Sequence, residues 1–256
     1  MKNVICFILV FVTGLGMFAQ KPADSIQVKT GRKKMLEFSA GYSVAFGAYA
    51  SVDKSDKKSG YASNGWLLQL NYASIGPYNV GFAFQYTYQN NKLNSSASQI
   101  RPNGWSSGTL GPGSWSNHYL MVGPVYNATF KKINVDARIL GGLIVSSSAN
   151  FTTQDPTDTT GMKKDANLAG GFGYGISAGV GYAVSSHVIL KINVSLIGGW
   201  PMKNREYASQ WIGTATYIDP VTGIKYYKPI YSSAVEYDIN KVVTTFNPLF
   251  GIIYRF

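Results

Sequence analysis

The sequence is poor in charged residues, in histidine and above all in cysteine. Charged residues make up 14% of the 256 residues, whereas a typical soluble domain carries about 25%. The one cysteine, Cys6, lies in an apolar stretch near the N-terminus, so we expect no disulfide and no cysteine metal site in the rest of the chain. With only two histidines in the whole sequence, we also expect no metal cluster and no cofactor.

Long hydrophobic runs are missing too. The longest apolar stretch, Val4–Met17, is shorter than the roughly 20 residues that a membrane-spanning helix needs. Lys2 precedes this stretch, and Ala19 follows it as a small residue suited to cleavage. This is the pattern of a secretory signal. We therefore interpret residues 1–19 as a cleaved signal peptide read by the Sec pathway. The alternative, an uncleaved anchor, is disfavoured by the polar segment that begins at Gln20.

Acidic residues are scarce relative to basic ones. Asp and Glu number 12 against 23 Lys and Arg, which gives a formal net charge of +11. Such a surplus attracts partners that carry phosphate groups. For a chain with an export signal we expect lipid head groups in this role, and no nucleic acid.

Apolar residues alternate with small or polar residues in eight separate segments. Near the middle of the chain, for example, Phe172 and Tyr174 alternate with Gly171, Gly173 and Gly175. Successive side chains of a strand point to opposite faces, so each segment predicts a β-strand with one apolar face. The segments are 36–48, 66–72, 80–89, 120–128, 133–143, 171–182, 188–196 and 242–256.

The connections between these segments alternate in length. Short turns lie near Gly76, at Lys131–Lys132 and at Ser185–His187, whereas long polar connections cover roughly 51–64, 90–117, 146–167 and 198–240. Short turns at one end and long loops at the other are typical of a transmembrane up-and-down barrel. We therefore predict an all-β fold: an eight-stranded antiparallel transmembrane β-barrel over residues 35–256, with short periplasmic turns and long extracellular loops.

An N-terminal tail and a projecting hairpin complete the predicted architecture. Residues 20–34 are expected to form a periplasmic N-terminal tail. In the last long connection, 214–218 and 224–228 flank a good turn sequence, so we expect a hairpin that projects above the membrane. The alternative is that this hairpin adds two strands to the barrel and makes ten.

The apolar face is the one we expect to meet lipid. It carries no charged residue on any of the eight segments, and a charge there would cost about 2–4 kcal/mol at the bilayer midplane. A soluble barrel with an apolar ligand cavity is the alternative, but its outer face would be charged. Aromatic residues fall where interfacial belts belong: Phe38, Trp66, Tyr72, Tyr88, Tyr126, Tyr174, Tyr182, Trp200, Tyr254 and Phe256.

These features together resemble the small outer-membrane β-barrel proteins of the OmpA/OmpX-like superfamily. The likeness rests on the export signal, the eight alternating segments, the alternating loop lengths and the terminal Tyr254-Arg255-Phe256. It implies localisation in the outer membrane, with membrane lipid and lipopolysaccharide as partners. It also implies that Phe256 is the assembly signal read by the barrel-assembly machinery.

Five charged residues lie on the face that we expect to line the lumen: Glu37, Asp136, Arg138, Lys191 and Arg255. Barrel closure would make the first and last strands neighbours, so we expect a cross-strand pair between Glu37 and Arg255. Buried charges need partners, and the Gly-rich face of segment 171–182 leaves room for long side chains. We expect a structural ion-pair network; a gate that opens when pairs exchange is the alternative.

Catalytic residues are not evident in the sequence. His118 lies near Ser116 but has no acidic neighbour, and His187 lies in a turn at the opposite rim. We therefore expect no enzyme. The leading function is a role in envelope integrity or adhesion through the long loops, with an extracellular glycan or protein as the candidate ligand. A narrow gated pore is the second possibility, and an enzyme that modifies envelope lipid is the third.

Overall fold

The computed structural model describes residues 32–51, 60–94, 109–110, 113–147, 151–154, 162–164, 168–218, 220, 222–231 and 235–256. For 109–110, 151–154, 162–164 and most of the described residues in 201–241 it describes the backbone alone. The expected signal peptide and nearly all of the expected tail lie outside the described residues. The first strand begins at Lys33, two residues before the boundary that we expected for the barrel.

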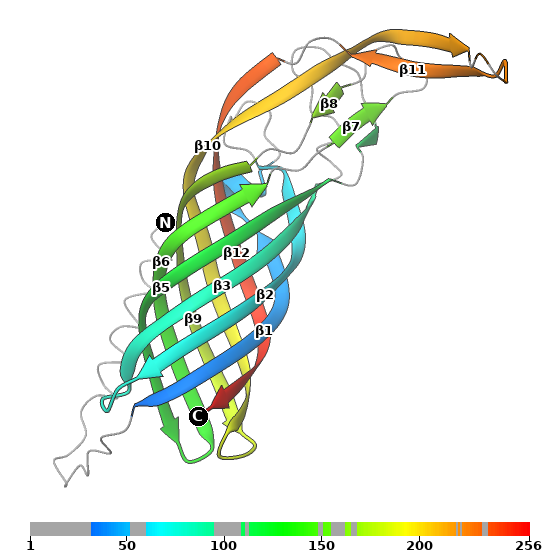
Figure 1. The fold of residues 1–256 in the computed structure, drawn as a ribbon. Helices are drawn as coiled ribbons and strands as arrows, with labels where there is room; N and C mark the ends of the chain where they lie inside the picture. Colours follow the sequence, from blue (N-terminus) through cyan, green and yellow to red (C-terminus); the bar gives the residue numbers. More distant parts are fainter. Residues whose placement is uncertain are drawn as a thin grey trace. The chain divides into compact units, whose positions relative to one another are not determined.

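Eight strands form a closed antiparallel barrel, as the sequence predicts (Figure 1). Each strand pairs with its neighbours along the chain, and closure comes from the pairing of the last strand with the first, in which Met35 lies opposite Arg255. The barrel strands are β1 (Lys33–Ala45), β2 (Ala62–Ile75), β3 (Val80–Leu93), β5 (Ser114–Phe130), β6 (Ile133–Ser147), β9 (Leu168–Ala183), β10 (Val188–Ile218) and β12 (Val235–Arg255). The fold class is therefore confirmed.

The short turns lie where the sequence places them, but the long connections are more structured than expected. A single 3-10 turn, η1 (Gly47–Tyr49), follows β1. Three small strands, β4 (Thr109–Leu110), β7 (Phe151–Gln154) and β8 (Met162–Lys164), pair with one another and with β10 beyond the barrel. Among the described residues, no helix is long and apolar enough to cross a membrane.

The expectation that 198–240 is a loop is wrong for most of its length. β10 runs without interruption from Val188 to Ile218, and β12 stays paired with it as far as Ala208 opposite Val235. From Trp211 onward the partner of β10 is β11 (Lys225–Tyr231). At about 3.3 Å per residue, residues 200–218 follow a path of about 60 Å. The predicted hairpin is present, and it extends β10 rather than adding two strands to the barrel.

A β-bulge marks the point where β10 and β12 leave the barrel. The register shifts between Gly199 and Met202 on β10, opposite Val243 and Lys241 on β12. Trp200 and Pro201 therefore face a single residue, Val242. Proline cannot donate a ladder hydrogen bond and is tolerated in sheets at such bulges. Bulges also bend a strand and increase its twist, which explains why β10 and β12 bend away from the barrel at this end (Figure 1).

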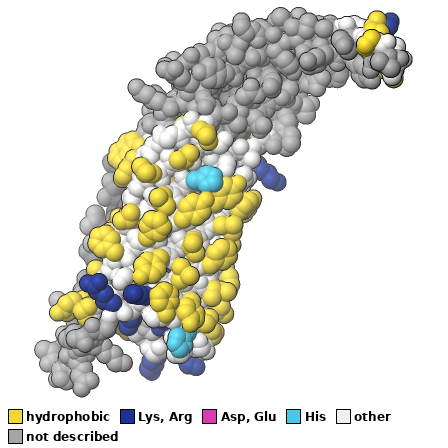
Figure 2. Space-filling view, viewed as in Figure 1, with side chains coloured by type: hydrophobic (Ala, Val, Ile, Leu, Met, Phe, Trp, Pro, Cys, Tyr) yellow, Lys and Arg dark blue, Asp and Glu magenta, His cyan; other side chains and the backbone are white. Residues whose placement is uncertain are grey.

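The outer face of the barrel is apolar, and the inner face is filled with buried side chains. Figure 2 shows hydrophobic side chains spread over the visible wall and basic side chains gathered toward the short-turn end. The outward residues on β1 and β6 illustrate the band, with Phe38 54% and Ile139 63% exposed. The inward neighbours are buried without exception in the middle of β3, at Gln85, Thr87 and Gln89. The alternation in the sequence therefore separates a lipid face from a packed lumen.

Candidate functional site in the lumen

Four charged side chains from three strands meet inside the barrel near its short-turn end. Arg138 on β6 donates through Nη2 to Glu37 on β1 and to Asp136 on β6, the second contact at 2.6 Å. Lys191 on β10 lies 3.1 Å from Glu37 Oε2 and 2.8 Å from Asp136 Oδ2. Each cation thus contacts both carboxylates. We call Glu37, Asp136, Arg138 and Lys191 the ion network.

The ion network is buried and electrically balanced. Its four residues are between 2% and 3% exposed, so each charge has given up most of its hydration. An isolated buried charge would be very costly, but two acids and two bases cancel one another. Ser39 Oγ donates to Glu37 Oε1 at 2.7 Å, and Asn193 Nδ2 donates to the same oxygen at 3.2 Å. The result is a neutral plug held by hydrogen bonds from β1 and β10.

A glycine in β9 provides the space for this plug. Gly179 lies in register between Asp136 on β6 and Asn193 on β10. A Cβ atom at this position would lie 2.3 Å from Lys191 Cε and 2.8 Å from Asp136 Oδ1. The absence of that atom allows the side chains from the two flanking strands to meet across β9. The Gly-rich inward face that the sequence shows on this strand thus makes room for long charged side chains.

Arg255 lies apart from the ion network. Its Nη2 donates to Thr129 Oγ1 at 2.8 Å. The register explains why the expected contact with Glu37 does not form: Arg255 lies opposite Met35, while Glu37 lies opposite Ile253. Of the five lumen residues inferred from the sequence, the structure brings four together and leaves Arg255 at the short-turn rim.

The long-loop half of the lumen is filled without charges, by apolar side chains on one side and by uncharged polar side chains such as Gln89 and Asn91 on the other. The apolar side chains are Tyr119, Met121, Ile144, Ile197 and Val243, all no more than 1% exposed. Glycines again make the space, since a Cβ atom at Gly173 would lie 3.2 Å from Tyr119 Cδ1. These five residues point into the lumen from four strands and pack together there. We call them the apolar seal.

Tyr49 covers the apolar seal from the first long connection. The η1 turn carries this side chain to a fully buried position, where Asn117 Nδ2 donates to its hydroxyl at 3.1 Å. The ring packs edge-on against Trp115 at 5.9 Å between centroids. Burial raises the pKa of the Tyr49 phenol well above its usual range, and the hydrogen bond from Asn117 offsets this only in part. The phenol therefore stays neutral.

Neither Tyr49 nor Trp115 was identified from the sequence as a lumen residue. Trp115 falls in a stretch that we expected to be loop, but it lies in β5 and is buried. The signal that could have found it is its odd-numbered position, in step with Tyr119 and Met121. No signal of this kind exists for Tyr49, because a 3-10 turn outside the strand pattern delivers it.

The two histidines lie at opposite ends of the barrel, as expected. His118 Nδ1 is 2.9 Å from the Tyr86 hydroxyl, and its ring lies 4.9 Å from Tyr88. His187 stacks on Tyr254 at 6.1 Å and contacts Ser186 Oγ. Both are therefore partners of belt aromatics. In the part of the chain that the structure describes, no group of three or more His, Cys, Asp or Glu side chains could hold a metal ion.

The aromatic residues assigned to the belts lie on the outer face of the barrel. Trp66 packs against Tyr88 at 5.3 Å, and Tyr174 packs against Trp200 at 6.1 Å, both toward the long-loop end. Toward the short-turn end, Tyr254 contacts Phe256 at 6.0 Å. Phe38, Tyr72 and Tyr182 are exposed, and Tyr126 is partly exposed. Aromatic side chains with a polar edge are favoured at both interfaces of a membrane.

A closed barrel with an apolar outer band and aromatic residues on that band is the architecture of a bacterial outer-membrane β-barrel protein. No protein-family model matches the chain, and no curated protein sequence matches it either. Solved structures do match. A major outer membrane protein from Thermus thermophilus has a TM-score of 0.51 and 11% identity, over 88% of this chain and 100% of that chain.

Two further solved structures illustrate the range of similar barrels. Neisserial surface protein A has a TM-score of 0.45 and 12% identity, over 88% of this chain and 99% of the other. The outer membrane protease OmpT from Escherichia coli has a TM-score of 0.47 and 10% identity, over 92% and 100%. At such low identity the likeness concerns the fold and not the activity.

Proposed function

We propose that this protein is a non-enzymatic outer-membrane anchor that carries a β-ribbon for interaction at the cell surface. The ribbon is defined as residues 202–218 of β10, β11, and residues 235–241 of β12. The observation that carries the proposal is its backbone pairing, with β12 from Met202 to Ala208 and with β11 from Trp211 to Ile218. A structure of this length is unnecessary for closing the barrel, which is complete below the bulge.

The composition of the ribbon supports a binding role. Tyr and Trp provide large contact areas at a low cost in conformational entropy and are enriched in binding surfaces. The tip also exposes two large apolar side chains, Ile218 at 54% and Ile224 at 52%. The aromatic residues of the ribbon sequence are Tyr207, Trp211, Tyr217, Tyr226, Tyr227, Tyr231 and Tyr237. A glycan or a protein is the class of ligand that suits them.

The filled lumen supports an anchor rather than an open channel. The ion network and the apolar seal occupy successive levels of an eight-stranded barrel, whose interior is only wide enough to be filled by side chains. Tyr49 lies above them at the long-loop end. In a barrel of this kind the side chains in the lumen stabilise the fold. We therefore propose that the ribbon is the part that interacts with other molecules.

Removal of the ribbon tests this proposal. Residues 203–240 are replaced by Asn-Gly, a favoured hairpin turn, and the wild-type and shortened barrels are compared on an array of immobilised glycans and on purified matrix proteins. We expect binding by the wild type and its loss from the shortened barrel. Tyr78→Ala, at a 77% exposed residue of a short turn, is the matched control and should bind like the wild type. Equal binding by the shortened barrel would refute the ribbon as the binding element.

A narrow gated pore is the second candidate, and one observation favours it. Gln69 Nε2 and both polar atoms of the Asn71 side chain are buried without a hydrogen-bond partner among the described residues. Buried polar groups of this kind commonly bind water. Glu37 also has two cationic partners, so one could leave while the other remains. Planar-bilayer recordings decide between the candidates: the anchor predicts no conductance, and discrete openings that change with Glu37→Gln would favour the pore.

A further inference from the structure

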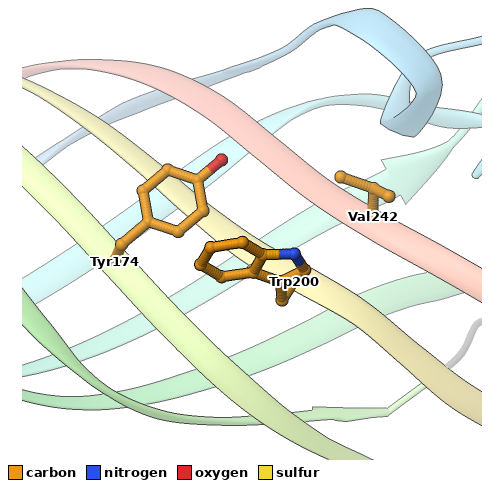
Figure 3. Close-up of a pocket in the computed structure, with 4 residues that line it drawn as sticks. Tyr174, Trp200 and Val242 are labelled. Carbon is orange, nitrogen blue, oxygen red and sulfur yellow. The ribbon is translucent and has the colours of Figure 1, made fainter.

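A pocket of about 410 Å³ opens on the outer face of the barrel at the β-bulge, lined by Tyr174, Gly199, Trp200 and Val242. Figure 3 shows the Trp200 indole between the Tyr174 ring on β9 and the Val242 side chain on β12. Volumes of about 300–1,000 Å³ are typical of ligand pockets. The pocket is separate from the ion network, and a molecule can bind in it whether or not the ribbon binds a ligand.

The pocket exists because two glycines and a register shift coincide. A Cβ atom at Gly198 would lie 2.4 Å from Tyr174 Cζ, so the Tyr174 ring lies directly over the backbone of that residue. At the next position Gly199 faces the lumen and Ile144. The bulge then places Trp200 and Pro201 opposite Val242 alone. The outer wall is consequently hollowed beside Gly198, where an outward side chain would otherwise fill it.

The surroundings of the pocket indicate hydrocarbon as its occupant. On the same outward face, Phe172 and Ile176 flank Tyr174 along β9, at 48% and 47% exposed, and Phe246 follows Val242 along β12 at 43%. These residues belong to the apolar band that faces lipid. The pocket is therefore continuous with the membrane interface, and a lipid chain can enter it without crossing water.

The charge just beyond the pocket indicates which lipid supplies that chain. Lys203 follows Trp200 on β10, opposite Asn240 of β12, and this position lies on the outward face toward the long-loop end, where the ribbon begins. In a lipid whose phosphates lie above its acyl chains, this position would be at the height of the phosphates.

We propose that the Tyr174–Trp200–Val242 pocket binds one acyl chain of a lipopolysaccharide molecule in the outer leaflet. The aromatic walls hold the chain by apolar contact, and the basic position of Lys203 above it favours a phosphorylated head group. The bound lipid would fill the hollow at the point where β10 and β12 part from the barrel wall, and so support the base of the ribbon.

Native mass spectrometry of the full refolded chain tests this inference. The protein in mild detergent is mixed with purified lipopolysaccharide or with phosphatidylethanolamine, and the ratio of lipid-bound to free barrel is measured. Val242→Phe fills the pocket and Trp200→Ala removes a wall. Both should lower the bound fraction of lipopolysaccharide by about tenfold in apparent affinity. Val194→Phe, at a 42% exposed outward position of β10 outside the pocket, should bind like the wild type.

Each other result contradicts the proposal. Equal retention of lipopolysaccharide by wild type and Val242→Phe would show that the pocket is not the site. Equal or tighter retention of phosphatidylethanolamine would overturn the choice of lipid, and an equal loss in Val194→Phe would indicate contact with the whole band. A heat-dependent shift in gel mobility shows that each variant is folded. None of these outcomes depends on whether the ribbon binds a ligand.

Discussion

The two halves of the lumen are closed by different means. Near the short-turn end, Glu37, Asp136, Arg138 and Lys191 meet as a neutral set of charges. Near the long-loop end there is no such set among the described residues, and Tyr119, Met121 and Ile144 pack beside uncharged polar side chains. Both halves use the same device, glycines on the inward face of β9, to admit large side chains. The glycine-rich strand β9 is therefore common to both halves, and only the side chains that fill the lumen differ.

The difference has an energetic consequence. A charged set tolerates the loss of a member poorly, because the remaining charges are left buried and unpaired. An apolar set loses only the contacts and the burial of the atoms removed, together with the cavity they leave. The ion network should therefore respond to single substitutions more strongly than the apolar seal does, and it should be rescued by a second substitution that restores neutrality.

Arg138→Met should have the largest effect, a loss of about 3–5 kcal/mol in the free energy of unfolding. Both Glu37 and Asp136 lose a hydrogen-bonded cation, and the set is left with a net negative charge. Urea unfolding of the barrel in phospholipid vesicles, followed by tryptophan fluorescence, measures the change.

Two further variants make this test specific. Arg255→Met removes the same type of side chain from a partly exposed site with one hydrogen bond, to Thr129, and should cost about 1 kcal/mol. Asp136→Asn added to Arg138→Met restores neutrality and should recover part of the stability, as coupled neighbours do. A double variant less stable than Arg138→Met alone would contradict charge balance as the basis of the plug.

Ile144→Ala tests the apolar seal and should cost about 2–5 kcal/mol. Its side chain lies against the backbone positions of Gly173 and Gly199, which cannot move in to fill the space. Ile139→Ala, on the same strand but 63% exposed to lipid, is the control. Lipid chains can fill the space left there, so the control should cost clearly less in the same unfolding assay. Equal costs would mean that the seal collapses around the cavity.

Gly179→Ala tests the wall that both halves share. The new methyl group would displace Lys191 and crowd Asp136 and Asn193, so we expect a loss of about 1–3 kcal/mol from overpacking. Gly170→Ala, in the same strand, meets a single atom at 3.9 Å and should change stability by less than about 0.5 kcal/mol. If both variants unfold at the wild-type urea concentration, the space at Gly179 is not what admits the network.

Much of the barrel could be predicted because lipid imposes a strict pattern. Every outward position must be apolar over the bilayer, and a two-residue period follows directly, as in Phe172, Tyr174 and Ile176. The ribbon lies beyond the bilayer and has no such constraint. Its strands therefore carry no continuous alternation, and 198–240 reads as a loop although most of it is paired.

The contacts in the lumen could be predicted only in part, because the residues of one strand do not determine its pairing register with the next strand. Inward charged residues can be found from their odd or even positions in a strand. Their height along the barrel axis, however, depends on how the tilted neighbouring strands are staggered. A stagger of two residues separates Arg255 from Glu37. Ser39 and Asn193, which hydrogen-bond to Glu37, look like many other small polar residues of the inward face.

Tyr49→Phe should have the smallest effect and tests whether the cover at the long-loop end behaves like the apolar seal beneath it. The substitution keeps the ring on Trp115 and removes the hydroxyl that accepts from Asn117. An N–H group of the Asn117 amide would then lose its acceptor, so we expect a loss of about 1 kcal/mol in the free energy of unfolding. Tyr42→Phe, at a 52% exposed outward position of β1, should be neutral within about 0.5 kcal/mol. If Tyr49→Phe is as stable as the wild type, ring packing alone holds the cover, and the cover behaves like the apolar seal beneath it.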